Sequence, residues 1–381
     1  MRILISTCPY PGHLGAHVPL ASELLDRGHR VVFATEPGFC GAVRDAGFPC
    51  GAVGSSGPLP AGPAGVPHAK CAGLVELGET ILPDVIVADE QDLAAMVAAE
   101  ALGVPCVTLG FTEFTRQPAW DTVARPALRE LRSRWARGGG RGGGPDEVPL
   151  AGHLNLVPRA FRRYAALRGE RALRPVCRQQ RGSLAPVPWL DRLPARPTIH
   201  VMLDTARINL MAGVAGWLSA QPVSVICTAE RGSDLAVIGS SGSGGSGGSI
   251  GERDNVYITG GVPLEQVLRH CDATVTSGGF NAVMAALQFG LPMLVVPLST
   301  DQEYIAGKIA DLGAGIRMTA ADLTRDTVPR AVRHLLIQPA HRVIAARLQE
   351  QIERMPGPEE AAAYLERQAQ GQGTPPLAGH L

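Results

Sequence analysis

The fold is decided by residues 271–298, which read CDATVTSGGFNAVMAALQFGLPMLVVPL. The β-branched, apolar residues 271–276 predict a strand, and the Ser-Gly-Gly at 277–279 predicts a sharp turn. Residues 281–288 predict a helix that stops at a Gly-Leu-Pro, and 293–297 predict a strand buried on both faces. This order of strand, turn, helix and strand is typical of a parallel α/β sheet.

The glycine turn also has a chemical meaning. A turn that leads into a helix leaves backbone N–H groups free at the positive end of the helix dipole, and such a site can hold a phosphate. An ordinary βαβ connection has the same sequence pattern, so spacing alone does not separate the two interpretations.

Composition narrows the class of protein. The chain has 381 residues, a length that favours two domains, and 45% of them are apolar. Basic and acidic residues number 35 each, which argues against a nucleic-acid partner. The eight cysteines show no metal-ligand spacing, so we expect no metal and a reduced, cytoplasmic protein. Neither a signal peptide nor an integral membrane segment is expected, since the chain opens with a strand and lacks a long apolar run.

The chain in order alternates predicted strands and helices. The first half contains apolar strands at 2–7, 30–34, 83–89 and 106–109, and the alternation restarts at 198–203. Such alternation predicts an α/β fold with parallel sheets. A proline-rich stretch before residue 198 suggests a boundary between two domains, 1–192 and 198–355. We expect the remaining tail, 356–381, to pack back on the first domain.

Three segments stand out by composition. Residues 137–145 are a glycine-rich break, and 239–249 are a Gly/Ser linker that is either natural or engineered. Eight arginines lie between 159 and 181, and we interpret them as a solvated helical face in preference to a binding patch, because no aromatic residues accompany them.

Taken together, the motifs resemble those of bacterial natural-product glycosyltransferases, the GT-B relatives of UDP-glycosyltransferases in glycosyltransferase family 1. The likeness covers nearly the whole chain. The stretches that carry it are GHLGAHVPLA at 12–21, PDVIVAD at 83–89, the glycine turn with its helix, and Asp301-Gln302. Any one stretch would be weak, but their order and spacing are specific.

The resemblance implies two Rossmann-like domains that face a central cleft, with the acceptor on the first domain and a nucleotide sugar on the second. His13 matches the base that removes a proton from the acceptor, a role for which an imidazole pKa is suited. Asp89 matches the carboxylate that orients this ring. His17, close by, is interpreted as structural or acceptor-lining. Residues 118–128 and 146–167 are the candidates for the rest of the acceptor site.

The resemblance also implies a donor site in the second domain. Thr205 and Asp301-Gln302 match residues that bind the sugar hydroxyls, and the glycine turn would hold the diphosphate. The predicted donor-binding residues are Thr205, Ser277, Gly278, Gly279, Phe280, Asn281, Asp301 and Gln302.

Several positions depart from the family pattern on the donor side. Ser277 replaces a histidine, so the side chain can donate a hydrogen bond but cannot carry positive charge. The other departures are Asp204 for a glycine, Gly261 for a stacking aromatic residue, Ala282 for a small hydroxyl residue and Ala285 for a ribose-binding glutamate. Each loss is expected to cost about 1–3 kcal/mol of donor affinity.

Two functions therefore remain open. The first is an inverting glycosyltransferase of antibiotic or other secondary metabolism, which moves a sugar from a TDP- or UDP-linked donor to a hydrophobic aglycone without a further cofactor. The second is a GT-B protein with a degenerate donor site, acting as an auxiliary subunit or using the cleft for a non-sugar reaction. A NAD-dependent oxidoreductase is disfavoured because no G-x-G-x-x-G follows the first strand. A homodimer is kept as an alternative to a monomer.

Overall fold

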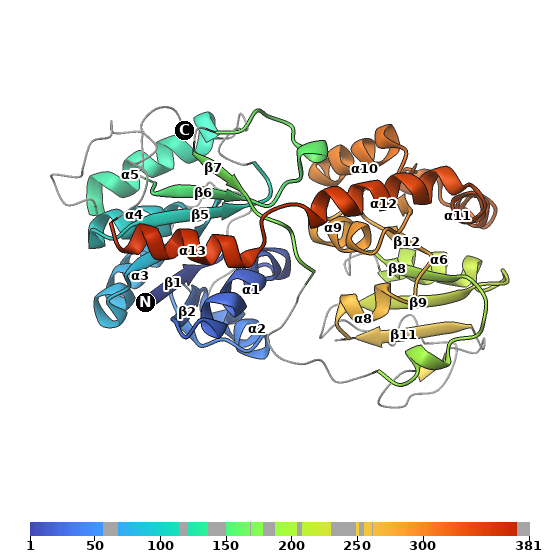
Figure 1. Ribbon diagram of the computed structural model, residues 1–381, viewed down its shortest axis with the longest axis horizontal. Coiled ribbons are helices and arrows are strands. Elements are labelled where there is room, and N and C mark those ends of the chain that lie inside the picture. The colour runs from blue at the N-terminus through green and yellow to red at the C-terminus, as the bar shows by residue number, and fades with distance from the viewer. Residues whose placement is uncertain are drawn as a thin grey trace. The chain divides into compact units, whose positions relative to one another are not determined.

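The computed structural model describes residues 1–55, 68–113, 120–135, 150–167, 169–177, 187–203, 208–229, 249–250, 255–260 and 262–371. The chain divides into two compact units (Figure 1). One unit combines Met1–Pro175 with Met355–Leu381, and the other contains Ser183–Arg354. The long segment of the second unit begins at Ser183, whereas the predicted first domain extends to residue 192.

The first unit is built on a fully parallel seven-stranded sheet in the order β3-β2-β1-β4-β5-β6-β7. Its strands are β1 (Arg2–Ser6), β2 (Arg30–Thr35), β3 (Cys50–Ala52), β4 (Val85–Asp89), β5 (Cys106–Gly110), β6 (Gly152–Asn155) and β7 (Glu170–Ala172). Its helices are α1 (Pro11–Asp26), α2 (Cys40–Asp45), α3 (His68–Ile81), α4 (Leu93–Leu102), α5 (Arg125–Trp135) and α13 (Pro358–Ala369). The order reverses between β1 and β4, as in a Rossmann fold.

The second unit repeats this arrangement, with the order β10-β11-β9-β8-β12-β13-β14. All neighbouring strands are parallel except β10 and β11. The strands are β8 (Thr198–Met202), β9 (Ser224–Ala229), β10 (Ser249–Ile250), β11 (Val256–Gly260), β12 (Ala273–Thr276), β13 (Met293–Val295) and β14 (Gly315–Arg317). The helices are α6 (Ile208–Leu218), α8 (Leu264–Leu268), α9 (Phe280–Gln288), α10 (Thr300–Leu312), α11 (Thr327–Ile337) and α12 (Pro339–Glu353). Here the order reverses between β8 and β12.

The central strands explain why the sheets form. All five residues of β4 are buried, and so are Ile3, Leu4 and Ile5 of β1. Helix α4 is buried over almost its whole length, and Asp92 caps it by accepting a hydrogen bond from the amide of Ala95 at 3.2 Å. Strands without a polar face need helices on both sides of the sheet, so the apolar runs dictate the layered α/β architecture. The predicted α/β fold of two Rossmann-like domains is confirmed.

Some local predictions were wrong. Helix α1 begins at Pro11, earlier than expected, because proline is favourable in the first turn of a helix, where its missing N–H is not needed. Arg159, Arg162, Arg163, Arg171 and Arg174 do not form a helical face; they lie on a short 3₁₀ turn, on β7 and in connecting segments. Arg168, Arg178 and Arg181 lie outside the described residues. Arg162 pairs with the buried Glu170 at 2.9 Å. Residues 136–149 and 230–248 lie outside the described residues. These ranges contain the whole glycine-rich break and nearly all of the Gly/Ser linker.

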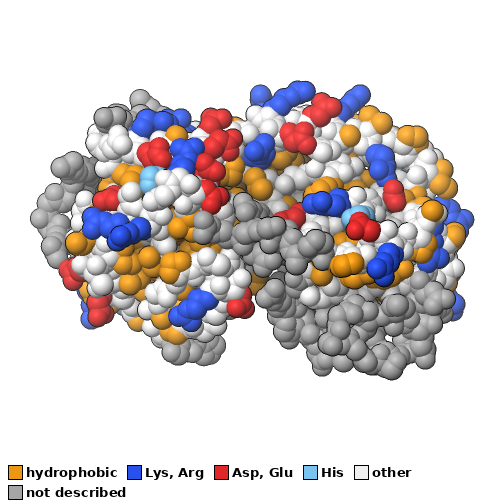
Figure 2. All heavy atoms as spheres, turned by 60° about the horizontal axis from the view of Figure 1, so that its bottom comes forward, with side chains coloured by type: hydrophobic (Ala, Val, Ile, Leu, Met, Phe, Trp, Pro, Cys, Tyr) orange, Lys and Arg blue, Asp and Glu red, His pale blue; other side chains and the backbone are white. Residues whose placement is uncertain are grey.

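The surface agrees with the balanced charge of the chain. On the face shown in Figure 2, basic and acidic side chains are interspersed among the described residues and do not gather into one large area of a single sign. A nucleic-acid-binding surface would show a continuous basic area. Among the described helices, none is long and apolar enough to cross a membrane.

Helix α13 returns to the first unit and packs against α1 (Figure 1). The Tyr364 hydroxyl donates a hydrogen bond to the carbonyl oxygen of Ala151 at 2.6 Å. Gly152 leaves room for this phenol, since a Cβ at this position would lie 2.0 Å from the Tyr364 oxygen. The guanidinium of Arg171 lies 4.4 Å from the centre of the same ring. Tyr364 therefore ties the end of the chain to the strand β6.

We expect Tyr364→Phe to lower the free energy of unfolding by about 1 kcal/mol, because it removes one hydrogen bond and retains the ring. Urea denaturation measures the change. Tyr10→Phe is the matched control, since this tyrosine is 51% exposed and the same deletion of a hydroxyl should have little effect. Equal stability of Tyr364→Phe and the wild type would show that the contact does not hold α13.

Candidate active site

The first candidate site lies where the strand order of the first unit reverses. Strands β1 and β4 are paired in parallel, with Ser6 opposite Ala88, so both chains leave the sheet at the same edge. In open α/β sheets, ligands bind in the crevice at such a switch point. His13 follows β1 as the third residue of α1, and Asp89 is the last residue of β4. The topology thus brings together two residues that are 76 positions apart.

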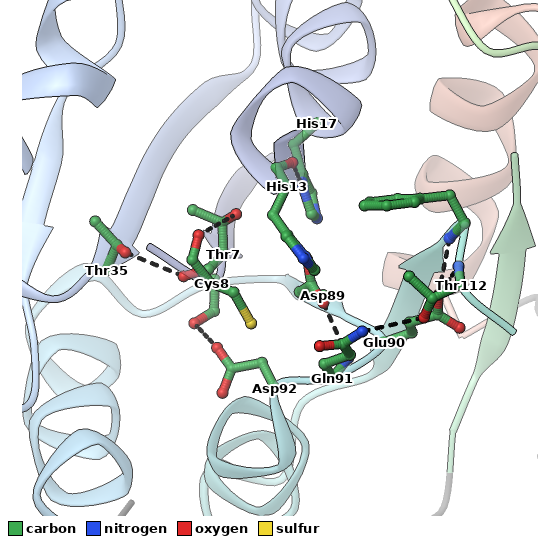
Figure 3. Close-up of polar contacts among 12 residues, drawn as sticks. Thr7, Cys8, His13, His17, Thr35, Asp89, Glu90, Gln91, Asp92 and Thr112 are labelled. Carbon is green, nitrogen blue, oxygen red and sulfur yellow. Dashed lines mark hydrogen bonds and ion pairs between the residues drawn. The ribbon is translucent and has the colours of Figure 1, made fainter. Parts of the chain in front are cut away.

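His13 and Asp89 form a close pair, as predicted (Figure 3). The distance from His13 Nδ1 to Asp89 Oδ2 is 2.6 Å, and the amide of Gln91 donates to the other carboxylate oxygen at 2.9 Å. The Asp89 side chain is 1% exposed and that of His13 is 14% exposed. Because a carboxylate only accepts hydrogen bonds, Nδ1 carries the proton of the neutral ring, and Nε2 presents its lone pair.

The electrostatics of the pair suit a base. Burial alone would lower the pKa of His13, but the charge and the hydrogen bond of Asp89 raise it above its ordinary 6.5, and Glu90 adds to the rise. Burial would raise the pKa of Asp89, whereas the adjacent His13 keeps it below 3.8. Asp89 therefore stays ionised and makes His13 a stronger base than a buried imidazole would otherwise be.

His17 lies one turn further along α1 and is fully buried. Its Nδ1 lies 2.9 Å from the carbonyl oxygen of His13, so the ring supports the backbone that carries the base. Burial lowers the pKa of His17, which keeps the imidazole neutral. This geometry favours the structural interpretation of His17.

Beside the pair lies a buried ionic cluster that the sequence did not reveal. Lys70 Nζ lies 2.8 Å from Asp92 Oδ2 and 3.3 Å from Glu36 Oε1, and it donates to the carbonyl oxygen of Thr7 at 3.2 Å. The Ser6 hydroxyl donates to Asp92 at 2.6 Å. Lys70 comes from the first turn of α3. A lone lysine among apolar helix residues was the only signal of this cluster.

Two aromatic rings lie against His13. The ring centre of Phe111 is 5.0 Å from that of His13, and the ring centre of Tyr10 is 5.7 Å away. The Phe111 loop is held by Glu90, whose Oε1 accepts from the amide of Phe111 at 2.8 Å and from the hydroxyl of Thr112 at 2.8 Å. The base thus lies in partly apolar surroundings. Sequence reasoning missed Phe111, because the loop after β5 carries no motif, and it missed Glu90, which follows β4 and acts on that loop only through tertiary contacts.

The second candidate site lies at the corresponding position of the second unit. Strand β12 ends at Thr276, beside β8, and the chain then turns through Ser277, Gly278 and Gly279 into α9. Gly278 has a φ of 89°, a conformation that favours glycine. A Cβ on Gly278 would also lie 2.8 Å from Val295 Cγ1. The turn therefore requires glycine at this position, and it leads directly into the N-terminus of α9, the positive end of the helix dipole.

The structure brings most of the predicted donor residues to this turn. Gln302 lies against Gly278: its carbonyl oxygen would be 3.3 Å from a Cβ there, and its Oε1 accepts from the amide of Leu298 at 2.8 Å. Asp301 is exposed in the first turn of α10, and Asn281 is half-buried in the first turn of α9. Thr205 lies outside the described residues, as do the departures Asp204 and Gly261.

Comparison with known proteins agrees with this geometry. Residues 248–367 match the family described as "Erythromycin biosynthesis protein CIII-like, C-terminal domain". The elloramycin glycosyltransferase ElmGT of Streptomyces olivaceus is 28% identical over 96% of this chain and 97% of its own length. The glycosyltransferase SnogD from Streptomyces nogalater superposes with a TM-score of 0.76 at 26% identity, over 97% of this chain and 99% of that one. This chain is a relative of the GT-B natural-product glycosyltransferases.

Two further relatives support the assignment. The 4′-demethylrebeccamycin synthase of Lentzea aerocolonigenes is 25% identical over 92% of this chain and 95% of its own length. The structure of the glycosyltransferase VinC in complex with dTDP has the same fold, with a TM-score of 0.76 at 23% identity, over 97% of this chain and all of that one. Within this GT-B glycosyltransferase, the predicted roles of the individual site residues remain predictions.

We expect Asp89→Asn to lower the pKa of His13, because the variant retains a hydrogen-bond partner but loses the negative charge that outweighs burial. The protonated imidazole would then persist only to a lower pH than in the wild type. NMR titration of the histidine side chain measures the midpoint. Asp84→Asn, on the partly exposed Asp84 that pairs with Arg2, is the matched control. An unchanged midpoint in Asp89→Asn would contradict the electrostatic account.

We expect Gly278→Ala to lower the free energy of unfolding by about 1–3 kcal/mol, because the new methyl group combines backbone strain with the contact to Val295. Gly279→Ala is the matched control, since the neighbouring glycine has an ordinary φ of −58° and no atom within 4 Å of its added Cβ. Thermal or urea unfolding compares them. Similar losses in the two variants would show that the turn does not depend on the left-handed glycine.

Proposed function

We propose that this protein transfers a sugar, with inversion, from a TDP-linked donor to a hydroxyl of a hydrophobic secondary-metabolite aglycone. The observation that carries the proposal is the 2.6 Å pair of His13 and Asp89 at the switch point of the first unit. The glycine turn at the switch point of the other unit supplies a place for the diphosphate. The reaction as proposed needs no cofactor beyond the nucleotide sugar.

The proposed chemistry is a single displacement. His13 Nε2 takes the proton from the acceptor hydroxyl, and the acceptor oxygen attacks the anomeric carbon. The bond from that carbon to the nucleoside diphosphate breaks, and its electron pair leaves with the diphosphate oxygen. Asp89 stabilises the imidazolium that forms, as the carboxylate does in a catalytic triad. The configuration of the anomeric carbon is inverted because attack and departure occur on opposite sides.

The donor site favours a sugar with few hydroxyls. Ser277 and the N–H groups of α9 can hold a diphosphate by hydrogen bonds and by the helix dipole. Ala285 is 1% exposed within α9 and offers no carboxylate to a ribose. Relatives point the same way: VinC was solved with dTDP, and a relative from Saccharopolyspora erythraea is named as a desosaminyl transferase. We therefore favour a TDP-deoxyhexose over a UDP-hexose.

The relatives favour an active transferase over an auxiliary subunit. Those named above as glycosyltransferases match over nearly the full length of this chain. The second possibility, a degenerate GT-B protein, is therefore not pursued as a function. All eight cysteines are free thiols, which supports a reducing, cytoplasmic location. A homodimer remains a prediction.

Calorimetry with TDP and with UDP tests the donor side of the proposal. We expect TDP to bind in the micromolar to low millimolar range and more tightly than UDP. Gly278→Ala should weaken TDP binding by at least about 10-fold, since a hydrogen bond to a charged group such as the diphosphate contributes about 1.5–3 kcal/mol. Failure of both nucleotides to bind at millimolar concentration would reject a nucleotide-sugar donor.

Transfer assays with TDP-sugars and a panel of hydroxylated polycyclic acceptors test the base. We expect His13→Ala to lower kcat by about 10²–10⁴-fold, because it removes general base catalysis, and to leave TDP affinity unchanged. His68→Ala is the matched control, since His68 is a partly exposed histidine paired with Glu130. A His13→Ala variant with wild-type turnover would exclude His13 as the base.

A further inference from the structure

Cys8 lies next to the His13–Asp89 pair and has no part in the proposed transfer. It follows β1 and is half-buried, and Figure 3 shows it between the pair and Asp92. One ligand atom from each of Cys8, His13 and Asp89 lies within 4.8 Å of the other two. A thiol, an imidazole and a carboxylate are three groups that bind zinc in proteins. No motif spacing in the sequence indicated this cluster, because the three residues meet only through the sheet topology.

The charge around these three groups favours a cation. Four carboxylates influence Cys8 or His13 electrostatically, those of Glu36, Asp89, Glu90 and Asp92, and all four lie in buried or nearly buried positions. Lys70 is a cation that acts on Cys8, and Glu36 and Asp92 already pair with it. The group therefore carries more negative than positive charge in a place with little solvent. A divalent ion would offset this excess.

We propose that Cys8, His13 and Asp89 form an inhibitory site for Zn²⁺. The preference for zinc follows from the ligands, because a thiolate and an imidazole select borderline or soft ions over Mg²⁺ and Ca²⁺. Three protein ligands would leave a fourth position for water, as in open zinc sites. The inference goes beyond the proposed function, since binding of the ion does not depend on sugar transfer.

Only a small rearrangement is needed. Zinc bonds of about 2.0–2.3 Å place tetrahedral ligand atoms about 3.3–3.8 Å apart. The His13 and Asp89 atoms, now 2.6 Å apart, would separate by about 1 Å, and Cys8 Sγ would move inward. Cys8 gives up its thiol proton to solvent on binding, and the imidazole retains one proton. When Nδ1 is the ligand, the metal replaces the hydrogen bond between His13 and Asp89.

Either ring nitrogen of His13 leads to inhibition. If Nδ1 binds the ion, the remaining proton moves to Nε2, which then cannot accept another from the acceptor. If Nε2 binds the ion, its lone pair is occupied directly. In both cases the base is lost, so zinc should inhibit transfer without competing with the nucleotide in the second unit.

Cobalt provides a readout that does not depend on activity, because a thiolate ligand to Co²⁺ gives a charge-transfer absorption in the near ultraviolet. We expect this band in the wild type, its removal by excess Zn²⁺, and no effect of Mg²⁺. Cys8→Ser should abolish the band and weaken zinc binding by at least about 100-fold, since even an outer partner of a metal ligand contributes 10–100-fold. Cys50→Ser is the matched control, because Cys50 is another half-buried free thiol of the same unit.

Three outcomes would overturn the proposal. One is the absence of a thiolate band in the wild type. Another is a band that persists in Cys8→Ser and disappears in Cys50→Ser, which would place the metal elsewhere. Zinc inhibition of transfer that is equal in the wild type and in Cys8→Ser would also reject Cys8 as a ligand. If the protein binds cobalt through Cys8 but transfers no sugar, the proposed metal site stands and only the proposed function is rejected.

Discussion

The parallel pairing of β1 with β4 is the constraint on which the site depends. Their hydrogen-bonded register sets Ile5 opposite Val87 and Ser6 opposite Ala88, which fixes where each chain leaves the sheet. Asp89 ends one strand, and the helix that begins at Pro11 carries His13 back over it. A shift of either strand by one residue would turn its side chains to the opposite face and separate the pair. The geometry of the His13–Asp89 pair follows from backbone pairing more than from local side-chain packing.

The buried charges explain how one imidazole can serve as a base in such surroundings. Burial lowers the pKa of His13, and the charge and hydrogen bond of the adjacent Asp89, together with the charge of Glu90, raise it by more. The amide of Gln91 donates a hydrogen bond to the other oxygen of Asp89 and so holds the carboxylate in place. The neighbouring Lys70 and Asp92 form an ion pair with each other, and Asp92 also accepts a hydrogen bond from the Ser6 hydroxyl. The same excess of carboxylates that strengthens the base also makes the place attractive to a metal ion. Function and susceptibility to inhibition would then have a common electrostatic origin.

Sequence reasoning predicted the α/β fold because strands buried on both faces read as apolar runs, such as 85–89 and 293–295. It missed short strands without that signature, including Cys50–Ala52 and Gly152–Asn155, because three or four residues with small or polar side chains carry little pattern. His13 and Asp89 were predicted from motifs, and the structure places them together. Lys70, which acts only through tertiary contacts, could not be found in that way.

The configuration of the product tests the central claim most directly. Incubation of the protein with an α-linked TDP-sugar and an accepted aglycone should give a β-linked product, because a base-assisted single displacement inverts the anomeric carbon. The coupling constant of the anomeric proton in the NMR spectrum distinguishes the two products. A β-linked product formed by the wild type and lost with His13→Ala is the result expected here. An α-linked product would require a double displacement and would contradict the role of His13 and Asp89.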